Sequence, residues 1–230
     1  MADEWVEWHR QYESDGHLSA RLKVVQERVR EALTSSPPGT IRLVSMCAGD
    51  GRDVLGALVD HPRRPDVRAR LVELSPELSA AGRAGAEGKG LSNVEVLTGD
   101  ASTSTAYDGA VPADIVLACG IFGNITDTDI RTTIAHLPEL CARGATVIWT
   151  RGRFEPDLTP TIREWFVESG FEELSFVPIP GTTGSVGAHR LVEEPRPFRP
   201  GVRLFTFLAK AERPSQRAKD RSSPPSPAPS

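Results

Sequence analysis

One stretch, residues 40–53, constrains the fold more than any other part of the chain. Residues 41–47 form an apolar run that is typical of a strand buried on both faces. The run stops at Gly49 and Gly51, after which apolar residues recur at helical spacing. Two glycines permit a tight turn and leave no Cβ atom in the way of a ligand. The pattern of strand, glycine turn and helix therefore predicts a cofactor-binding site.

The charges of this turn indicate which cofactor it suits. A dinucleotide fingerprint has a third Gly or Ala for close helix packing and no negative charge beside the pyrophosphate. Here the third position is Val54, and Asp50 and Asp53 lie where phosphates would bind. Acidic side chains repel a pyrophosphate but attract a ligand that carries an ammonium and a sulfonium. S-adenosyl-L-methionine is such a ligand, and we favour it over a nicotinamide dinucleotide.

The turn resembles the first motif of the class I S-adenosylmethionine-dependent methyltransferases, a Rossmann-like superfamily, and the resemblance covers roughly residues 40–210. The family's pattern of acid-x-Gly-x-Gly-x-Gly falls on Ser45, Cys47, Gly49 and Gly51, so two of the four positions differ. Because Ser45 replaces the acid, another carboxylate of the turn would have to meet the methionine ammonium. A plain strand-to-helix turn without a ligand is the alternative for this stretch alone.

An acid on the second predicted strand supports the resemblance. Glu73 follows Gly51 by 22 residues, close to the roughly twenty at which a doubly wound fold places an acid for the ribose hydroxyls. A carboxylate at the end of an apolar strand is costly unless it has such partners. The resemblance places Leu74 and Ser75 beside the adenine, and Asp100 and Ala101 after the third strand, where an acid accepts from the adenine amino group. A turn or helix-capping role is the alternative for Asp100.

The resemblance also assigns residues to the cofactor and to the methyl acceptor. It implies that the fourth strand, residues 113–119, ends in a floor between the two ligands. The residues expected at the cofactor are Ala48, Gly49, Asp50, Gly51, Asp53, Glu73, Leu74, Ser75, Asp100, Ala101, Cys119 and Gly120. Those expected at the acceptor are Trp8, Tyr12, Phe122, Asn124 and Arg151.

The N-terminal segment is predicted to be helical over residues 4–33, with a break at Asp15-Gly16. Its aromatic residues recur at spacings of three and four, which places them on one helix face. In methyltransferases of this kind such an addition often forms a lid over the cofactor, and a sulfonium favours nearby aromatic faces. The alternative is that these residues only pack the helix onto the core.

The later strands are expected at residues 145–150, 173–179 and 203–209, with a long loop at 180–201. With the resemblance, the alternation predicts an α/β fold: a three-layer, doubly wound, seven-stranded, mostly parallel sheet with one antiparallel strand, plus the N-terminal helical addition. The expected domains are a helical lid at 1–38, a Rossmann-like methyltransferase domain at 39–210 and a disordered tail at 211–230, which has no apolar periodicity.

Composition bounds the partners and the compartment. A net charge of −4 offers no general field for nucleic acid or an anionic membrane. No apolar run approaches the roughly 18 residues of a membrane span, and the start lacks the features of a signal peptide. The three cysteines show neither a paired framework nor metal-ligand spacing, so we expect no metal site. The chain is expected to be soluble and cytoplasmic; its oligomeric state is left open.

The predicted function is transfer of a methyl group from S-adenosylmethionine to a small organic acceptor. The alternatives are an NAD(P)-dependent oxidoreductase and a noncatalytic S-adenosylmethionine-binding protein. Methyl transfer needs alignment and, for a protonated nucleophile, a base. The candidate bases are His189, in the predicted loop, and His9, because imidazole titrates near neutrality. The sequence does not separate O-, N- and C-methylation.

Overall fold

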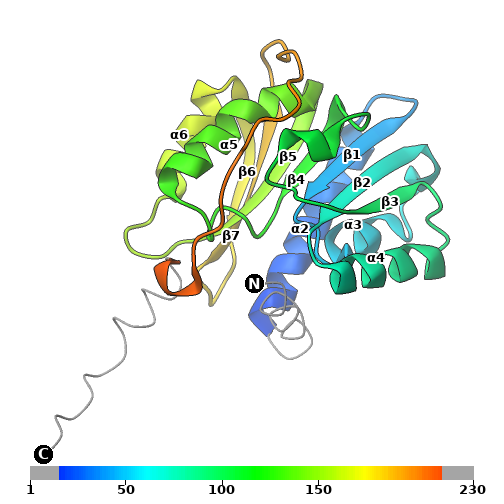
Figure 1. The fold of residues 1–230 in the computed structure, drawn as a ribbon, viewed down its shortest axis with the longest axis horizontal. Helices are drawn as coiled ribbons and strands as arrows, with labels where there is room; N and C mark the ends of the chain where they lie inside the picture. The colour runs from blue at the N-terminus through cyan, green and yellow to red at the C-terminus, as the bar shows by residue number, and fades with distance from the viewer. Residues whose placement is uncertain (1–15, 214–230) are drawn as a thin grey trace, which may run out of the picture.

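The computed structural model describes residues 16–213, which form one seven-stranded sheet with helices on both faces (Figure 1). The strands are β1 (Ile41–Met46), β2 (Val67–Glu73), β3 (Val94–Thr98), β4 (Ala113–Ala118), β5 (Cys141–Gly152), β6 (Phe171–Pro178) and β7 (Gly184–Leu191). The α-helices are α2 (Gly16–Ser35), α3 (Arg52–Leu58), α4 (Pro76–Gly88), α5 (Asp127–Leu140) and α6 (Thr159–Glu168). Short 3₁₀ helices are η2 (Arg64–Asp66), η3 (Ser104–Tyr107) and η4 (Lys210–Glu212).

The strand order is β3-β2-β1-β4-β5-β7-β6, and only β7 runs against the others. This arrangement confirms the predicted fold class. The order reverses between β1 and β4, and ligands of open α/β sheets bind at such a switch point, outside the carboxyl ends of the strands. We call this side of the sheet, with the loops that follow β1 to β6, the carboxyl edge. It includes the glycine turn after β1.

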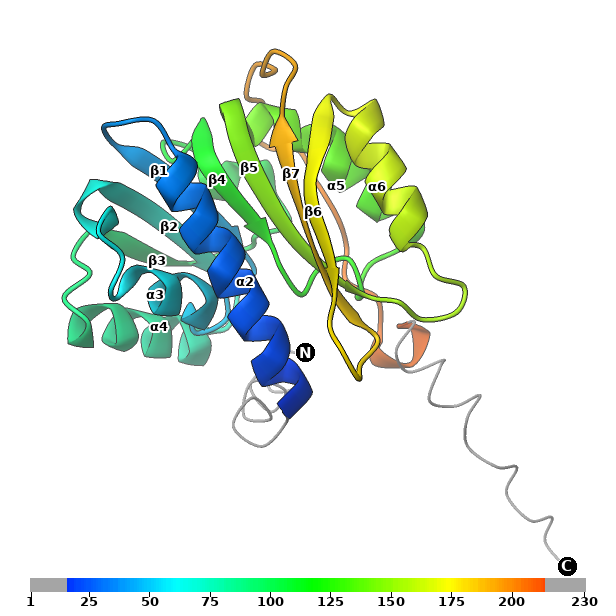
Figure 2. The ribbon, with the colours of Figure 1, turned by 180° about the vertical axis from the view of Figure 1, so that it is seen from behind.

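The sheet is the middle of three layers because its central strands are apolar on both faces. In β1, Leu43 and Val44 are adjacent, point to opposite faces and are both buried. Helices α5 and α6 cover the face seen in Figure 1, while α2 crosses the face seen in Figure 2 together with α3. Burial on both sides is what a parallel sheet requires of its strands.

Helix α2 forms part of the back layer rather than standing apart from the fold. Its apolar residues Val25, Val29 and Leu33 are buried in one cluster with α3 and the back of the sheet. Gln26 Nε2 donates to the carbonyl of Arg52 at 2.9 Å, which joins α2 to the start of α3. Packing therefore explains the apolar residues of the segment from residue 16 onward. The predicted lid aromatics lie outside the described residues.

The prediction for the last strand is wrong. Residues 203–209 make only isolated bridges, Thr103 with Arg203 and Ile125 with Phe207. We call residues 199–208 the strap, which crosses the front of the sheet beside α5 (Figure 1). Its Leu204 and Phe205 are 2% and 1% exposed in the core with α5 and α6. Burial of the strap, and not strand pairing, accounts for its apolar pattern.

The seventh strand instead lies in the predicted loop at 180–201. β7 pairs with β5 and β6 through residues 184–191, and its glycines made the segment resemble a loop. A Cβ atom built on Gly187 would lie 2.3 Å from the Trp149 ring, so this strand has a glycine where a large ring needs the space. The strand predicted at residues 145–150 is also longer than expected, because α5 ends at Leu140 and β5 runs from Cys141 to Gly152.

Candidate active site

The glycine turn after β1 is held against the end of β2. The amide of Ala48 donates to the carbonyl of Val72 at 2.9 Å, and Gly51 N donates to Ala48 O at 2.9 Å. Gly51 has φ 76°, and a Cβ atom there would come within 2.7 Å of the Leu71 side chain. A side chain at this position would be both strained and crowded. The turn thus keeps bare backbone at the carboxyl edge.

The Glu73 carboxylate joins this turn to the loop after β2. One oxygen accepts from Gly49 N at 2.9 Å and the other from Ser75 N at 2.8 Å. The side chain of Leu74, the residue between, is 63% exposed although it is apolar. Each carboxylate oxygen has two lone-pair positions, so both can accept a further hydrogen bond. An oriented acid and an exposed apolar side chain therefore stand next to each other.

Asp100 follows β3 at the same edge and carries several hydrogen bonds. Its Oδ1 accepts from Ser102 N at 2.9 Å and from Ser102 Oγ at 2.5 Å, and its Oδ2 accepts from Arg203 Nη1 at 2.9 Å. Partial burial raises the pKa of Asp100, but the hydrogen bonds from Ser102 and the charge of Arg203 outweigh it, and the pKa is lowered overall. Asp100 is thus held as a carboxylate.

The two acids in the glycine turn have different surroundings. Asp50 forms an ion pair with Arg52, whose Nε donates to Oδ1 at 2.8 Å. Burial raises the pKa of the Cys119 thiol, the charge of Asp53 raises it further and that of Arg21 opposes this, so both charged groups act on Cys119. Arg21 belongs to α2, and sequence reasoning missed it because a single arginine on a helix resembles an ordinary solvated charge. The structure adds Arg21 to the candidate residues at the carboxyl edge.

Backbone contacts build the loop after β4. Gly120, with φ 74°, donates from its amide to Thr150 Oγ1 at 2.8 Å, and its carbonyl accepts from Asn124 Nδ2 at 2.7 Å. The amide side chain of Asn124 is therefore used to close its own loop. Its carbonyl accepts from Leu208 N at 2.9 Å, which ties the strap to this loop.

Arg151 lies at the end of β5 with its guanidinium almost entirely enclosed. The residue is 6% exposed, and Nη1 donates to the carbonyl of Phe122, while Nε has no hydrogen-bond partner. Burial lowers the pKa of Arg151, against the charges of Asp127 and Asp157. A buried guanidinium is costly unless it is paired, and the Phe122 carbonyl and the charges of Asp127 and Asp157 offset part of this cost.

The Phe122 side chain points into the core and not toward a ligand. It is fully buried, with ring centroids 5.9 Å from Trp149 and 6.4 Å from Phe166. Only its carbonyl reaches the site, through Arg151. The predicted contact between this ring and an acceptor therefore gains no support.

His189 does not lie in a loop, as the sequence had suggested, but in the middle of β7. It is fully buried and stacks on Phe166 with centroids 4.3 Å apart, and Nδ1 accepts from Trp149 Nε1 at 3.1 Å. Burial lowers the pKa of His189 to about 4, against the opposing charge of Glu173. A neutral, enclosed imidazole serves packing, and the premise for a catalytic role is wrong. The other candidate, His9, lies outside the described residues with Trp8 and Tyr12.

The cysteines at the edge do not pair. Cys47 packs against the front cluster of buried residues and Cys119 against the back cluster, although both follow central strands. All three cysteines are free. Burial raises the pKa of the Cys47 thiol, and the charges of Glu73 and Asp100 raise it further. A protonated thiol is a poor nucleophile, so Cys47 acts here as a small apolar side chain.

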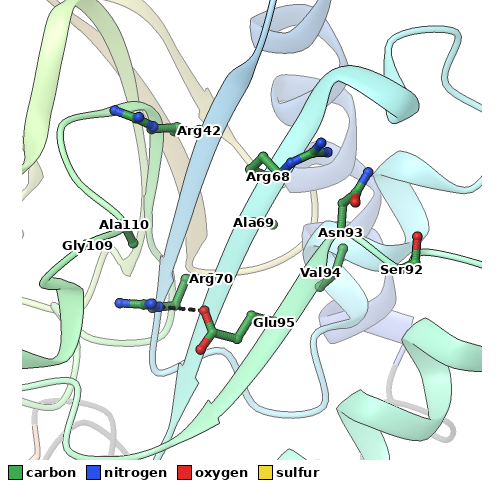
Figure 3. A pocket seen from close by; sticks show the side chains of 10 residues that line it. All are labelled: Arg42, Arg68, Ala69, Arg70, Ser92, Asn93, Val94, Glu95, Gly109 and Ala110. Atoms are coloured by element: carbon green, nitrogen blue, oxygen red, sulfur yellow. Dashed lines mark hydrogen bonds and ion pairs between the residues drawn. The ribbon is translucent and has the colours of Figure 1, made fainter.

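A separate hollow of about 340 Å³ lies away from the glycine turn, near the amino ends of β2 and β3 (Figure 3). Three arginines, Arg42, Arg68 and Arg70, line it on one face of β1 and β2. Their side chains diverge in Figure 3, where Arg68 extends toward Asn93 and Arg70 pairs with Glu95. Because the three charges do not converge, the hollow lacks the geometry of an anion site.

The helices of residues 16–213 include none with the length and apolar character to span a bilayer. No three metal-binding side chains of this part of the chain gather in one place.

The family is shown by comparison with known sequences. The model of the family described as "Putative methyltransferase" matches residues 10–166, which is more than half of the chain. The chain therefore belongs to this methyltransferase family. No curated protein matches the sequence.

Solved methyltransferases share the fold at low identity. An O-methyltransferase family protein from Burkholderia thailandensis is 16% identical with a TM-score of 0.59, over 74% of this chain and 55% of that one. Magnesium protoporphyrin IX methyltransferase from Synechocystis PCC 6803, solved with bound SAM, is 13% identical with a TM-score of 0.64, over 81% and 90%. N-methyltransferase NodS from Bradyrhizobium japonicum WM9 is 15% identical with a TM-score of 0.57, over 78% and 98%. The chain thus spans about half the length of the first of these and has the class I methyltransferase fold.

Proposed function

We propose that this protein transfers a methyl group from S-adenosylmethionine to a small organic acceptor at the carboxyl edge. The observation that carries the proposal is the Glu73 carboxylate, which bridges Gly49 and Ser75 at the switch point of the sheet. Family membership supports the reaction class, and the Synechocystis relative was solved with bound SAM. The cofactor supplies an electrophilic methyl group on a sulfonium.

The residues present fit such a cofactor. The free lone pairs of Glu73 can accept from both ribose hydroxyls, and the exposed side chain of Leu74 offers an apolar surface to the adenine ring. Asp100 can accept from the adenine amino group. The carboxylates of the glycine turn suit the ammonium of the methionine moiety.

Arg21 completes the assignment at the methionine end. A free amino acid carries a carboxylate as well as an ammonium, and a guanidinium binds a carboxylate in bidentate geometry. The charges of Arg21 and Asp53 both act on Cys119, which follows β4. We therefore place the cofactor carboxylate at Arg21 and its ammonium at Asp53.

The acceptor is assigned to the β4 and β5 ends, next to Gly120, Asn124 and Arg151. The positive charge of Arg151, at the end of β5, favours an acceptor that carries a carboxylate. The packing of His189 leaves the site without an assigned general base among residues 16–213. Holding the nucleophile in line with the methyl group then supplies most of the catalysis.

Isothermal titration calorimetry with S-adenosylmethionine, S-adenosylhomocysteine, NAD and NADP tests the cofactor. We expect binding of the first two ligands only. Glu73→Gln removes the charge and should lower their affinity about 100-fold, because hydrogen bonds to charged groups contribute about 1.5–3 kcal/mol each. Glu95→Gln, which changes an exposed acid on β3, is the matched control and should leave the affinity unchanged.

The rival functions predict other results. Binding of NAD or NADP alone would make the protein an oxidoreductase. Tight S-adenosylmethionine binding without methyl transfer to any member of a panel of phenols, amines and carboxylic acids would favour a noncatalytic binder. No binding of any of the four ligands would overturn the proposal.

A further inference from the structure

The strap brings Arg203 to the cofactor side of the carboxyl edge in a fixed position. The residues on both sides of Arg203 are anchored to the loop after β3: Ser104 N donates to Val202 O at 2.9 Å, and Leu204 N donates to Ser102 O at 2.8 Å. The Leu204 side chain then enters the core. With both neighbours held, the backbone of Arg203 has little freedom, and its side chain extends to Asp100.

Arg203 and Ser102 together use three of the acceptor positions of Asp100. Ser102 donates twice to Oδ1, and Arg203 Nη1 donates to Oδ2 and also contacts Ser102 Oγ. A carboxylate has about four lone-pair positions. One position on Oδ2 therefore remains, and the Asp100 side chain is still 45% exposed.

We propose that Arg203 is a positioning residue for adenine recognition: it orients Asp100 so that the remaining lone pair of Oδ2 accepts a hydrogen bond from the 6-amino group of S-adenosylmethionine. This inference rests on the proposed function. It makes the strap, more than 100 residues from the glycine turn in sequence, part of the adenine subsite. Arg203 acts through Asp100 and does not touch the adenine itself.

A purely structural role for this ion pair is disfavoured by its surroundings. The Arg203 side chain is 57% exposed, and exposed ion pairs contribute little to stability. The strap is already held by backbone hydrogen bonds and by the buried side chains of Leu204 and Phe205. An arginine is therefore not needed here to keep the strap in place, and its substitution should leave the protein folded.

The test measures binding of two ligands that differ at the 6-position and N1 of the purine: S-adenosylhomocysteine has a 6-amino donor and an acceptor N1, whereas S-inosylhomocysteine has a 6-oxo acceptor and a protonated N1. The wild type should prefer the amino ligand, because an oxygen facing Asp100 is repelled. Arg203→Gln should weaken S-adenosylhomocysteine binding about tenfold, the effect of roughly one charged hydrogen bond, and shrink the preference between the ligands. Arg203→Lys should restore part of the affinity for S-adenosylhomocysteine and part of the preference between the two ligands.

Binding measured over a range of pH separates a role of Arg203 in positioning Asp100 from a general disruption of the binding site. Without Arg203 the pKa of Asp100 rises, so the affinity for S-adenosylhomocysteine should fall at a higher pH in Arg203→Gln than in the wild type as the solution is acidified. The control is Arg199→Gln, which breaks an ion pair between the same strap and Glu139 of α5. This control should keep both the affinity and its pH profile.

Three outcomes overturn the inference. The first is binding of S-adenosylhomocysteine by Arg203→Gln as tight as by the wild type, the second is an equal loss of affinity for both ligands, and the third is the same effect in Arg199→Gln. Failure of the wild type to bind S-adenosylhomocysteine at all would instead contradict the proposed function, and the inference with it. Thermal unfolding of each variant shows that the comparison is between folded proteins.

Discussion

The two sides of the switch point hold their carboxyl-edge loops in different ways. On the β1–β3 side, carboxylates bind backbone amides: Glu73 accepts from Gly49 and Ser75, and Asp100 accepts from Ser102. On the β4–β7 side, the front face of the strands is filled by rings, with Trp149 and Phe166 stacked 5.8 Å apart. The first side presents polar groups to a ligand, whereas the second encloses its large side chains. Substitutions of the carboxylates on the first side should therefore affect cofactor binding, and substitutions of the buried rings on the second should affect stability.

The largest expected effect is on the stability of the aromatic side. Trp149 is fully buried, contacts four other rings and donates to His189. Trp149→Ala should lower the free energy of unfolding by about 3–5 kcal/mol, because it opens a large cavity. Urea unfolding followed by circular dichroism measures this loss. Trp165→Ala, at a partly exposed position of α6, is the control and should cost clearly less.

An equal loss in the two variants would contradict the contrast between the sides. The contrast also requires that Glu73→Gln, on the polar side, change ligand affinity more than stability.

The second effect concerns pH and His189. Its pKa in the folded state, about 4, lies below the ordinary value of 6.5, so between these values the unfolded chain binds a proton that the folded protein does not. Stability contributed by the neutral imidazole is complete above pH 6.5 and is lost as the pH falls toward 4, by about 3 kcal/mol from a shift of this size.

Urea unfolding at pH 7 and at pH 4.5, on wild type and His189→Gln, measures this difference. Other acidic groups titrate in both proteins, so the extra loss in the wild type belongs to His189. The glutamine can still accept from Trp149, which limits damage at pH 7. A wild type that loses no more stability than the variant would return His189 to the list of accessible, titrating groups.

The same contrast explains what the sequence could predict. The glycine turn, Glu73 and Asp100 are local signals, since a strand end, a spacing of about twenty residues and a turn can be recognised without knowing the rest of the fold. The fold class followed from the resemblance that these signals carried. On this side, the structure places the predicted residues together at one edge.

The misassignments on the other side have a common cause in long-range packing. Gly187 and His189 look like loop residues until Trp149 and Phe166 are placed against them. Leu204 and Phe205 look like a strand until the strap is seen to bury them beside α5. Arg21 and Arg203 reach the edge from an N-terminal helix and from the strap, and no spacing rule connects either of them with the glycine turn.

The smallest of these effects comes from adding a single methyl group where Gly187 packs against the Trp149 ring. Gly187→Ala places a methyl group 2.3 Å from the Trp149 ring in the observed backbone, so the ring or the strand must move. Such overpacking costs about 1–3 kcal/mol. Gly88→Ala is the matched control, because a Cβ atom there meets no atom within 4 Å and lies in a helix, where alanine is favoured. Thermal unfolding should therefore show a lower Tm for Gly187→Ala and an unchanged or higher Tm for Gly88→Ala. A Gly187→Ala protein as stable as the wild type would mean that Trp149 has room to move, and that β7 carries glycine there for some reason other than the ring.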